Sequence, residues 1–161
     1  MIVSNSSPLI NLSAIGEFNL LKELYGEIFI PSAVWDEVVI KGKGQPGAEE
    51  VGNAKWVKKK LVANMSFVEV LTLNLDKGEA EAIALAKEKD AEILLIDDKL
   101  ARKIAHHLGL NYIGLLGVLR EAKSKGIIKN IKGYMDLLRT AAGFWISEDV
   151  YRNILKLENE L

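Results

Sequence analysis

The stretch Ile93–Lys99, with the sequence ILLIDDK, decides the fold that we expect for this chain. A short apolar run of this kind is typical of a strand buried on both faces, as in a parallel sheet covered by helices. In such sheets ligands bind just beyond the carboxyl ends of the strands, and Asp97 and Asp98 fall at that position. Adjacent carboxylates repel each other, so a divalent cation is the simplest reason to place two of them there.

The length and composition are typical of one globular domain over residues 1–161. Of the 161 residues, 49% are hydrophobic and 27% are charged. No apolar run is long enough to span a bilayer, and the first residues lack the basic flank of a signal peptide, which predicts a cytoplasmic protein. The net charge of −1 is less basic than that of a nucleic-acid coat protein, although an acidic pocket can offset basic patches elsewhere.

The side chains available for binding a metal are mostly those with oxygen atoms. Cysteine is absent, and the only two histidines, His106 and His107, are adjacent. These facts exclude a disulfide framework and a thiolate site, and they argue against a His-rich zinc centre. Hard cations such as Mg2+ or Mn2+ prefer the oxygen ligands that remain.

Strand-like and helix-like segments alternate, which predicts an α/β fold with three layers, a central, mainly parallel sheet and extra C-terminal helices. The expected strands are Met1–Ser4, Glu27–Ile30, Phe67–Leu71, Ile93–Ile96 and Asn111–Ile113. The expected helices are Ser6–Ile15, Glu17–Tyr25, Pro31–Ile40, Ala48–Lys60, Lys77–Lys89, Lys99–Leu108, Leu115–Lys125, Ile131–Ala142 and Ser147–Leu161. The Gly- and Pro-rich stretch Lys41–Gly47 is the clearest loop.

Helical periodicity selects two glutamates as candidates for a site. Glu37 flanks the expected buried stripe of its helix, whereas Asp36 turns toward solvent. Glu79 heads the apolar stripe of the alanine-rich helix, whereas Glu81 shares a polar side with Glu88. The alternatives are an ordinary surface acid for Glu37 and an acid favoured by the helix dipole for Glu79.

The strand ends supply the remaining candidates. Asp98 can also act as the N-cap of the helix that follows, but Asp97 needs no such role. Asn5 and the serines after the first strand offer oxygen atoms at the same sheet edge, although an N-cap role explains at least one serine. The predicted metal ligands are Asn5, Glu37, Glu79, Asp97 and Asp98, of which the four acids are also the predicted catalytic residues.

Carboxylates around Mg2+ or Mn2+ suit phosphodiester hydrolysis, because the metal activates water and stabilises charge on the phosphate. Neither a Walker motif nor a G-x-G-x-x-G loop occurs, and neither histidine has an evident carboxylate partner for a serine triad. The expected substrate contacts are Ser7, Lys41, Lys43, Lys99 and Arg102, the basic ones binding phosphate without reading sequence. The tryptophans could stack on bases, but aromatic residues at helical spacing more often belong to the core.

The order of four motifs resembles that of PIN-domain proteins over essentially the whole chain. These are Asn5-Ser6-Ser7 at the first strand end, PSAVWDEV around Glu37, GEAEAIALA around Glu79 and LLIDDKLAR around Asp98. The segments SNSSPLI at Ser4–Ile10, GLLGVL at Gly114–Leu119 and FWIS at Phe144–Ser147 are similar to those of a variant prokaryotic group.

The resemblance implies a metal-dependent ribonuclease, often the VapC-type toxin of a toxin–antitoxin pair and frequently a homodimer. It matches Glu37, Glu79 and Asp98 to acidic positions of the family, with Asp97 beside the last. The chain departs from the family in one place, because Asn5 stands where the usual pattern has Asp, and its amide oxygen carries no charge. A catalytically weak RNA- or protein-binding module is therefore the main alternative, and a phosphotransferase ranks last.

Overall fold

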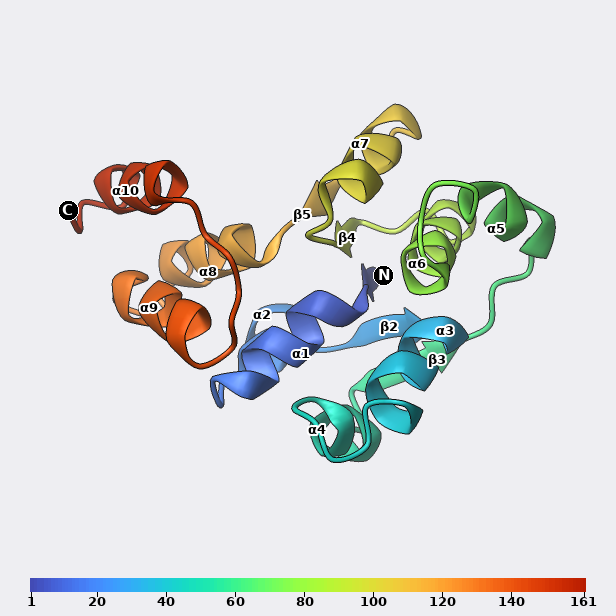
Figure 1. Cartoon of the computed structure of the whole chain (residues 1–161), viewed down its shortest axis with the longest axis horizontal. Coiled ribbons are helices and arrows are strands. Elements are labelled where there is room, and N and C mark those ends of the chain that lie inside the picture. Colours follow the sequence, from blue (N-terminus) through green and yellow to red (C-terminus); the bar gives the residue numbers. More distant parts are fainter.

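The computed structural model describes residues 1–161, and its centre is a five-stranded sheet (Figure 1). The strand order is β3-β2-β1-β4-β5, and all neighbouring strands are parallel. The strands are β1 (Ile2–Ser4), β2 (Ile28–Pro31), β3 (Val57–Lys60), β4 (Ile93–Leu95) and β5 (Tyr112–Ile113). The predicted α/β fold is confirmed, since helices connect these strands throughout.

Ten α-helices and one π-helical turn surround the sheet. They are α1 (Ser6–Ala14), α2 (Asn19–Tyr25), α3 (Ser32–Trp35), η1 (Asp36–Ile40), α4 (Ala48–Asn53), α5 (Met65–Leu71), α6 (Lys77–Glu88), α7 (Lys99–His107), α8 (Leu115–Ser124), α9 (Lys132–Thr140) and α10 (Glu148–Leu157). None of them has both the length and the apolar character required to cross a bilayer.

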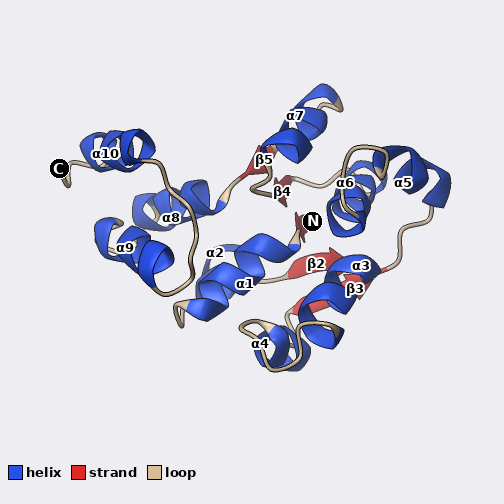
Figure 2. Ribbon diagram, viewed as in Figure 1, coloured by secondary structure: helices blue, strands red, loops and turns tan.

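The two faces of the sheet bury separate apolar clusters, because successive side chains of a strand point to opposite faces. Val3, Leu94 and Ile96 belong to a cluster with α5, α6 and α7. Ile2 and Leu95 belong to a larger cluster with α1, α2 and α8–α10. Figure 2 shows the red strands between these two groups of helices, which gives the predicted three layers.

The order in which strands are added to the sheet reverses between the neighbouring strands β1 and β4. From β1 the strands β2 and β3 follow on one side, and β4 and β5 lie on the other. Ligands of open parallel sheets bind beyond the carboxyl ends of the strands at such a reversal. Asn5 and Asp97 follow β1 and β4, so this topology brings them to the same edge.

Two predicted elements are wrong, and both lie between β2 and α6. The expected helix Ala48–Lys60 ends at Asn53, and Val57–Lys60 pairs with β2 as an edge strand. Its three consecutive lysines give no alternation of apolar and polar residues, so the sequence did not indicate a strand, although charged residues are common on edge strands. The expected strand at Phe67–Leu71 is helix α5, whose N-cap Asn64 accepts a hydrogen bond from the Phe67 amide at 3.1 Å.

The expected helix Pro31–Ile40 exists, but its second half is wider than an α-helix. Residues Asp36–Ile40 form η1, in which the Lys41 amide donates to the Asp36 carbonyl at 2.7 Å. Gly42 follows this turn, and a Cβ there would lie 2.4 Å from the Val38 carbonyl oxygen, so no larger residue fits. Single π-helical turns are frequent at functional sites, and this one carries Glu37.

Candidate active site

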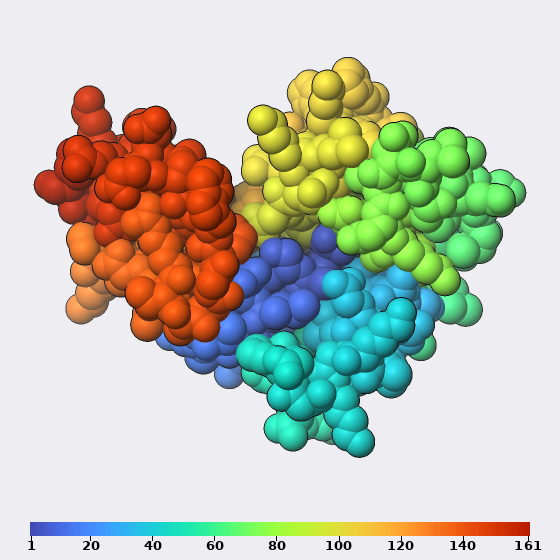
Figure 3. Space-filling view, in the orientation of Figure 1, coloured from blue at the N-terminus to red at the C-terminus, as the bar shows by residue number.

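A cavity of about 360 Å³ lies beyond the carboxyl ends of β1 and β4, and the five predicted metal ligands all line it. Figure 3 shows the blue, cyan, green and yellow segments that supply its lining meeting near the centre of this face, with a separate hollow between the yellow segment and the orange and red C-terminal helices. The cavity is lined by Asn5, Ser6, Ser7, Ile10, Asn11, Glu37, Asp76, Glu79, Asp97 and Asp98.

The serines after β1 hold two of the acids. The Ser6 hydroxyl donates to Glu37 Oε2 at 2.7 Å, and the Ser7 hydroxyl donates to Asp97 Oδ2 at 3.1 Å. Asn11, one helical turn after Ser7, donates to the Ser7 hydroxyl at 3.0 Å and fixes its orientation. The expected N-cap role of a serine is wrong, because the N-cap position of α1 is Asn5. Asn5 makes no side-chain capping bond, which leaves its amide oxygen free for the cavity.

Gly78, near the start of α6, leaves room for three oxygen atoms from three different elements. A Cβ at this position would lie 3.1 Å from Glu37 Oε2, 3.5 Å from Asn5 Oδ1 and 3.6 Å from Asp76 Oδ1. These oxygen atoms therefore surround a space that only glycine leaves open. Asp76 was not among the predicted site residues. Its place three residues before Glu79, in the Asp-x-x-Glu spacing of a capping box, was the signal that could have found it.

Asp97 has a structural role that the sequence did not predict. Its Oδ1 accepts a hydrogen bond from the Leu115 amide at 2.8 Å, so it caps helix α8 across the sheet edge. Burial raises the pKa of the Asp97 carboxyl above its ordinary value, although the bonds from Leu115 and Ser7 and the Arg102 charge act in the opposite direction. Both oxygens accept hydrogen bonds, so its orientation in the cavity is fixed.

Asp98 and Glu79 each combine a cap with a place in the cavity. Asp98 accepts from the Ala101 amide at 2.9 Å as the N-cap of α7, as its alternative interpretation had it. Glu79 Oε1 accepts from the Asp76 amide at 3.1 Å in the capping box of α6. Burial first, and then the charges of Asp76, Asp98 and Glu37, raise the pKa of Glu79 to about 7, while the Asp76 amide lowers it.

The spacing of Glu81 predicted a place on a polar side of α6, and this prediction is wrong. Its side chain is buried and accepts a hydrogen bond from the Ala33 amide at 3.0 Å, at the start of α3. Because α3 continues into η1, this bond ties the element that carries Glu37 to the helix that carries Glu79. Nothing in the periodicity could reveal a bond to a backbone amide 48 residues away.

The predicted basic contacts separate into two groups. Lys41 and Lys43 are exposed in the loop after η1 and do not line the acidic cavity. Lys99 and Arg102 lie on α7, in an adjoining cavity that includes Asp97 and Asp98 in its wall. The structure thus brings only the α7 residues close to the candidate site.

The donor set of the acidic cavity fits a hard divalent cation. Five carboxylates and the Asn5 amide supply oxygen atoms, and no lysine or arginine lines the cavity itself, although the Arg102 charge acts on Asp97 from the adjoining one. The space around Gly78 gives three of these oxygens a common neighbourhood. No three of the His, Cys, Asp and Glu side chains already stand as a preformed metal site.

The comparison with known protein families agrees with the fold. A family model described as PIN domain matches residues 1–160, which is nearly the whole chain. No curated protein matches the sequence. PIN domains are generally metal-dependent nucleases, and the α/β fold of this chain is consistent with that family. The chain therefore belongs to the PIN-domain family.

Proposed function

We propose that this PIN domain is a Mg2+- or Mn2+-dependent endoribonuclease that hydrolyses phosphodiester bonds of RNA. The observation that carries the proposal is the cavity at the carboxyl ends of β1 and β4, where five carboxylates meet without a basic residue among them. Asn5, Glu37, Glu79, Asp97 and Asp98 are the proposed ligands, with Asp76 added by the geometry around Gly78. A bound divalent cation would activate water and stabilise charge on the phosphate.

Three of the proposed ligands are already held by hydrogen bonds within the chain. Asp97 is held at both oxygens by Leu115 and Ser7, so it is oriented before substrate binds. Glu37 is held at one oxygen by Ser6. Glu79 Oε1 accepts a hydrogen bond from the Asp76 amide, so its other oxygen is the one left to bind a cation, which would keep the carboxyl ionised.

Cleavage of a panel of structured and unstructured RNAs with Mn2+, Mg2+ or EDTA tests this function. Asp97→Asn removes one charge from the cavity but keeps an oxygen for the Leu115 amide. Asp149→Asn, the same change at an exposed position of α10, is the matched control. We expect metal-dependent cleavage by the wild type and by the Asp149 variant, and none by the Asp97 variant. Equal cleavage by all three would contradict the proposal.

Asn5 keeps a second function open, that of a binding module with weak or no cleavage. One charge fewer than the usual pattern weakens attraction for a cation, and the carboxylates are not preassembled as ligands. This alternative predicts RNA binding that neither EDTA nor Asp97→Asn changes. Fluorescence anisotropy with labelled RNA, run beside the cleavage assay, distinguishes it from the nuclease.

We also propose that the chain is the toxin of a toxin–antitoxin pair. An antitoxin segment would cover the acidic cavity, with an Arg or Lys side chain among the carboxylates. Co-expression with the product of a neighbouring small gene tests the idea. An antitoxin should co-purify with the chain and suppress its cleavage, and a neighbour that does neither would count against the proposal.

A homodimer is the assembly that we propose for this chain. The C-terminal helix α9 leaves Leu137 exposed, which provides apolar surface for a second copy. Sedimentation equilibrium over a range of concentrations measures the molar mass directly. A mass near 17.8 kDa at every concentration would show a monomer instead.

A further inference from the structure

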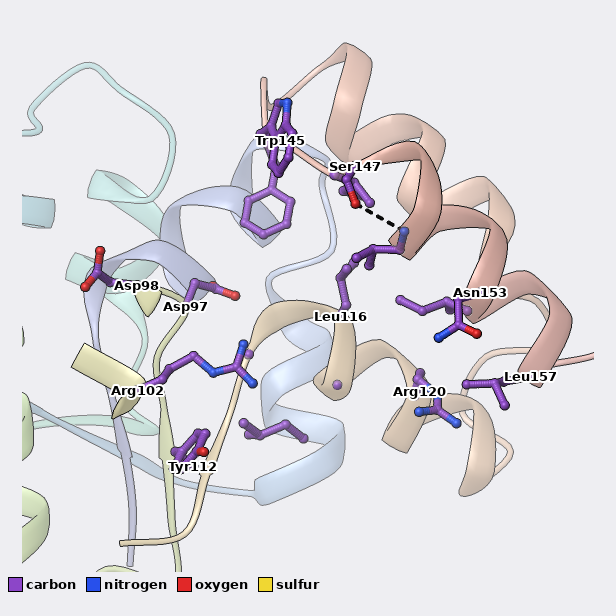
Figure 4. Close-up of a pocket in the computed structure, with 17 residues that line it drawn as sticks. Asp97, Asp98, Arg102, Tyr112, Leu116, Arg120, Trp145, Ser147, Asn153 and Leu157 are labelled. Atoms are coloured by element: carbon purple, nitrogen blue, oxygen red, sulfur yellow. Dashed lines mark hydrogen bonds between the residues drawn. The ribbon is translucent and has the colours of Figure 1, made fainter. Parts of the chain in front are cut away.

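A second cavity, of about 620 Å³, opens directly beside the acidic cavity and shares Asp97 and Asp98 with it. Tyr112 and Arg102 form one wall, and the segment from Phe144 through α10 forms the opposite wall. Figure 4 shows Arg102 directed into this space, with Asp97 on one side and Tyr112 on the other. An RNA strand that enters the acidic cavity can therefore continue into the second cavity without leaving the protein surface.

The second cavity presents an exposed aromatic side chain on a fixed support. Trp145 is 82% exposed, although its neighbour Ile146 is buried and Phe144 packs against the core. Arg139 donates to the Ile146 carbonyl at 2.9 Å and holds the segment in place. Trp145 belongs to neither apolar core cluster, and an exposed indole is a group on which nucleic-acid bases can stack.

Arg102 supplies a positive charge between the two cavities. It takes part in no ion pair, and its guanidinium lies 5.3 Å from the centre of the Tyr112 ring. A Cβ on Gly114 would lie 2.8 Å from Asp97 Oδ1 and 3.3 Å from Arg102 Nη1, so glycine lets both side chains reach the boundary. Arg120, on the far side, is already paired with Glu158 at 2.8 Å.

We propose that this second cavity is a nucleobase subsite for single-stranded RNA, in which Trp145 stacks on one base and Arg102 binds the adjacent phosphate. Lys99 and Lys103 line the adjoining surface together with Tyr112 and Trp145, so positive charge continues along the same path. Phosphate complements these cations and a base complements the indole, which selects RNA over an apolar partner. The inference rests on the proposed ribonuclease function and deepens it.

Fluorescence anisotropy in Ca2+, with a gel to show that no cleavage occurs, tests the subsite. The probes are a fluorescein-labelled oligouridine and an abasic ribose-phosphate oligomer of the same length. The proteins are the wild type, Trp145→Ala, Trp145→Phe and Leu73→Ala, the last truncating an apolar side chain that is also exposed, at 80%, but lies elsewhere. Truncation of exposed side chains leaves folding intact, and circular dichroism checks this.

We expect Trp145→Ala to weaken oligouridine binding about 5- to 150-fold, the loss that corresponds to one base–aromatic stack. Trp145→Phe should recover much of the affinity, and Leu73→Ala should lose none. All four proteins should bind the abasic oligomer equally, because it has no base to stack.

Three results would overturn the subsite. These are unchanged oligouridine binding by Trp145→Ala, an equal loss on the abasic oligomer, or burial of Trp145 against a second copy as protein concentration rises. The last is visible as weaker acrylamide quenching of its fluorescence. Cleavage that fails while binding still depends on Trp145 would contradict the nuclease alone. Cleavage that depends on Asp97 while binding ignores Trp145 would contradict the subsite alone.

Discussion

Asp97 Oδ1 accepts a hydrogen bond at 2.8 Å from the amide of Leu115, so one carboxylate both caps helix α8 and faces the acidic cavity. Its other oxygen, Oδ2, accepts a hydrogen bond from the Ser7 hydroxyl at 3.1 Å. The strand β4, the helix α1 and the helix α8 are therefore joined through a single side chain at the point where the reaction is proposed. Changes at Asp97 should separate its structural contribution from its chemical one.

We predict that Asp97→Ala destabilises the fold by about 1–3 kcal/mol, because the partly buried Leu115 amide loses its acceptor. Asp97→Asn keeps an oxygen acceptor for that amide and should cost less than about 1 kcal/mol, mostly because the Ser7 hydroxyl loses its acceptor. Urea unfolding measures both. RNA cleavage should be absent from both variants. If both variants lose the same amount of stability, Asp97 does not stabilise the fold by capping α8.

Gly78→Ala should damage the site without damaging the fold. The added Cβ would lie 3.1 Å from Glu37 Oε2 and would push that carboxylate aside, whereas alanine itself favours a helix. We expect weaker Mn2+ binding in calorimetry and slower cleavage, with a melting temperature at or above that of the wild type. Gly133→Ala in α9, where a Cβ meets nothing within 4 Å, is the matched control and should raise stability with no effect on cleavage.

Because the pKa of Glu79 is raised, the difference in stability between the wild type and Glu79→Gln should depend on pH. The folded chain holds the proton up to about pH 7, whereas the unfolded chain releases it near its ordinary pKa of 4.5. Stability from this group is therefore fully present below pH 4.5 and is lost as pH rises through 7. Glu79→Gln cannot ionise, so in EDTA it should match the wild type at pH 4 and exceed it at pH 8.

At pH 8 the free energy of unfolding of Glu79→Gln should exceed that of the wild type by about 1 kcal/mol. The difference is no larger because solvent screens this partly exposed side chain. Thermal or urea unfolding at several pH values measures it. The same variant should lose cleavage at every pH. A stability gain that is equal at pH 4 and pH 8 would show that ionisation of Glu79 is not its cause.

Asn5→Asp should strengthen metal binding at the expense of the metal-free fold. A carboxylate at this buried position, close to the same space as Glu37 and Asp76, adds repulsion without a cation and attraction with one. We expect a lower melting temperature in EDTA and a larger rise on addition of Mn2+ than the wild type shows. Asn130→Asp, at an exposed position outside the cavity, should change neither value by a comparable amount.

The parallel sheet and the acidic edge could be predicted because each depends on a local pattern. The run before Asp97 marks β4, and the topology of parallel strands then brings Asn5 to the same edge. The edge strand β3 could not be recognised, since its lysines give no apolar alternation. Asp76 was overlooked although its capping-box spacing was visible. The bonds of Asp97 to Leu115 and of Glu81 to Ala33 depend on backbone amides brought close only by folding.

The lysines of β3 bear on how copies of this protein meet. β3 is the outer strand of the sheet, and Lys59 and Lys60 lie over the rings of Trp35 and Phe29, each at 5.8 Å. An outer strand carries unpaired peptide groups that could extend the sheet into another molecule. Like charges would oppose two such edges, so uncontrolled strand-by-strand polymerisation is disfavoured, and specific association is left to the helical surfaces.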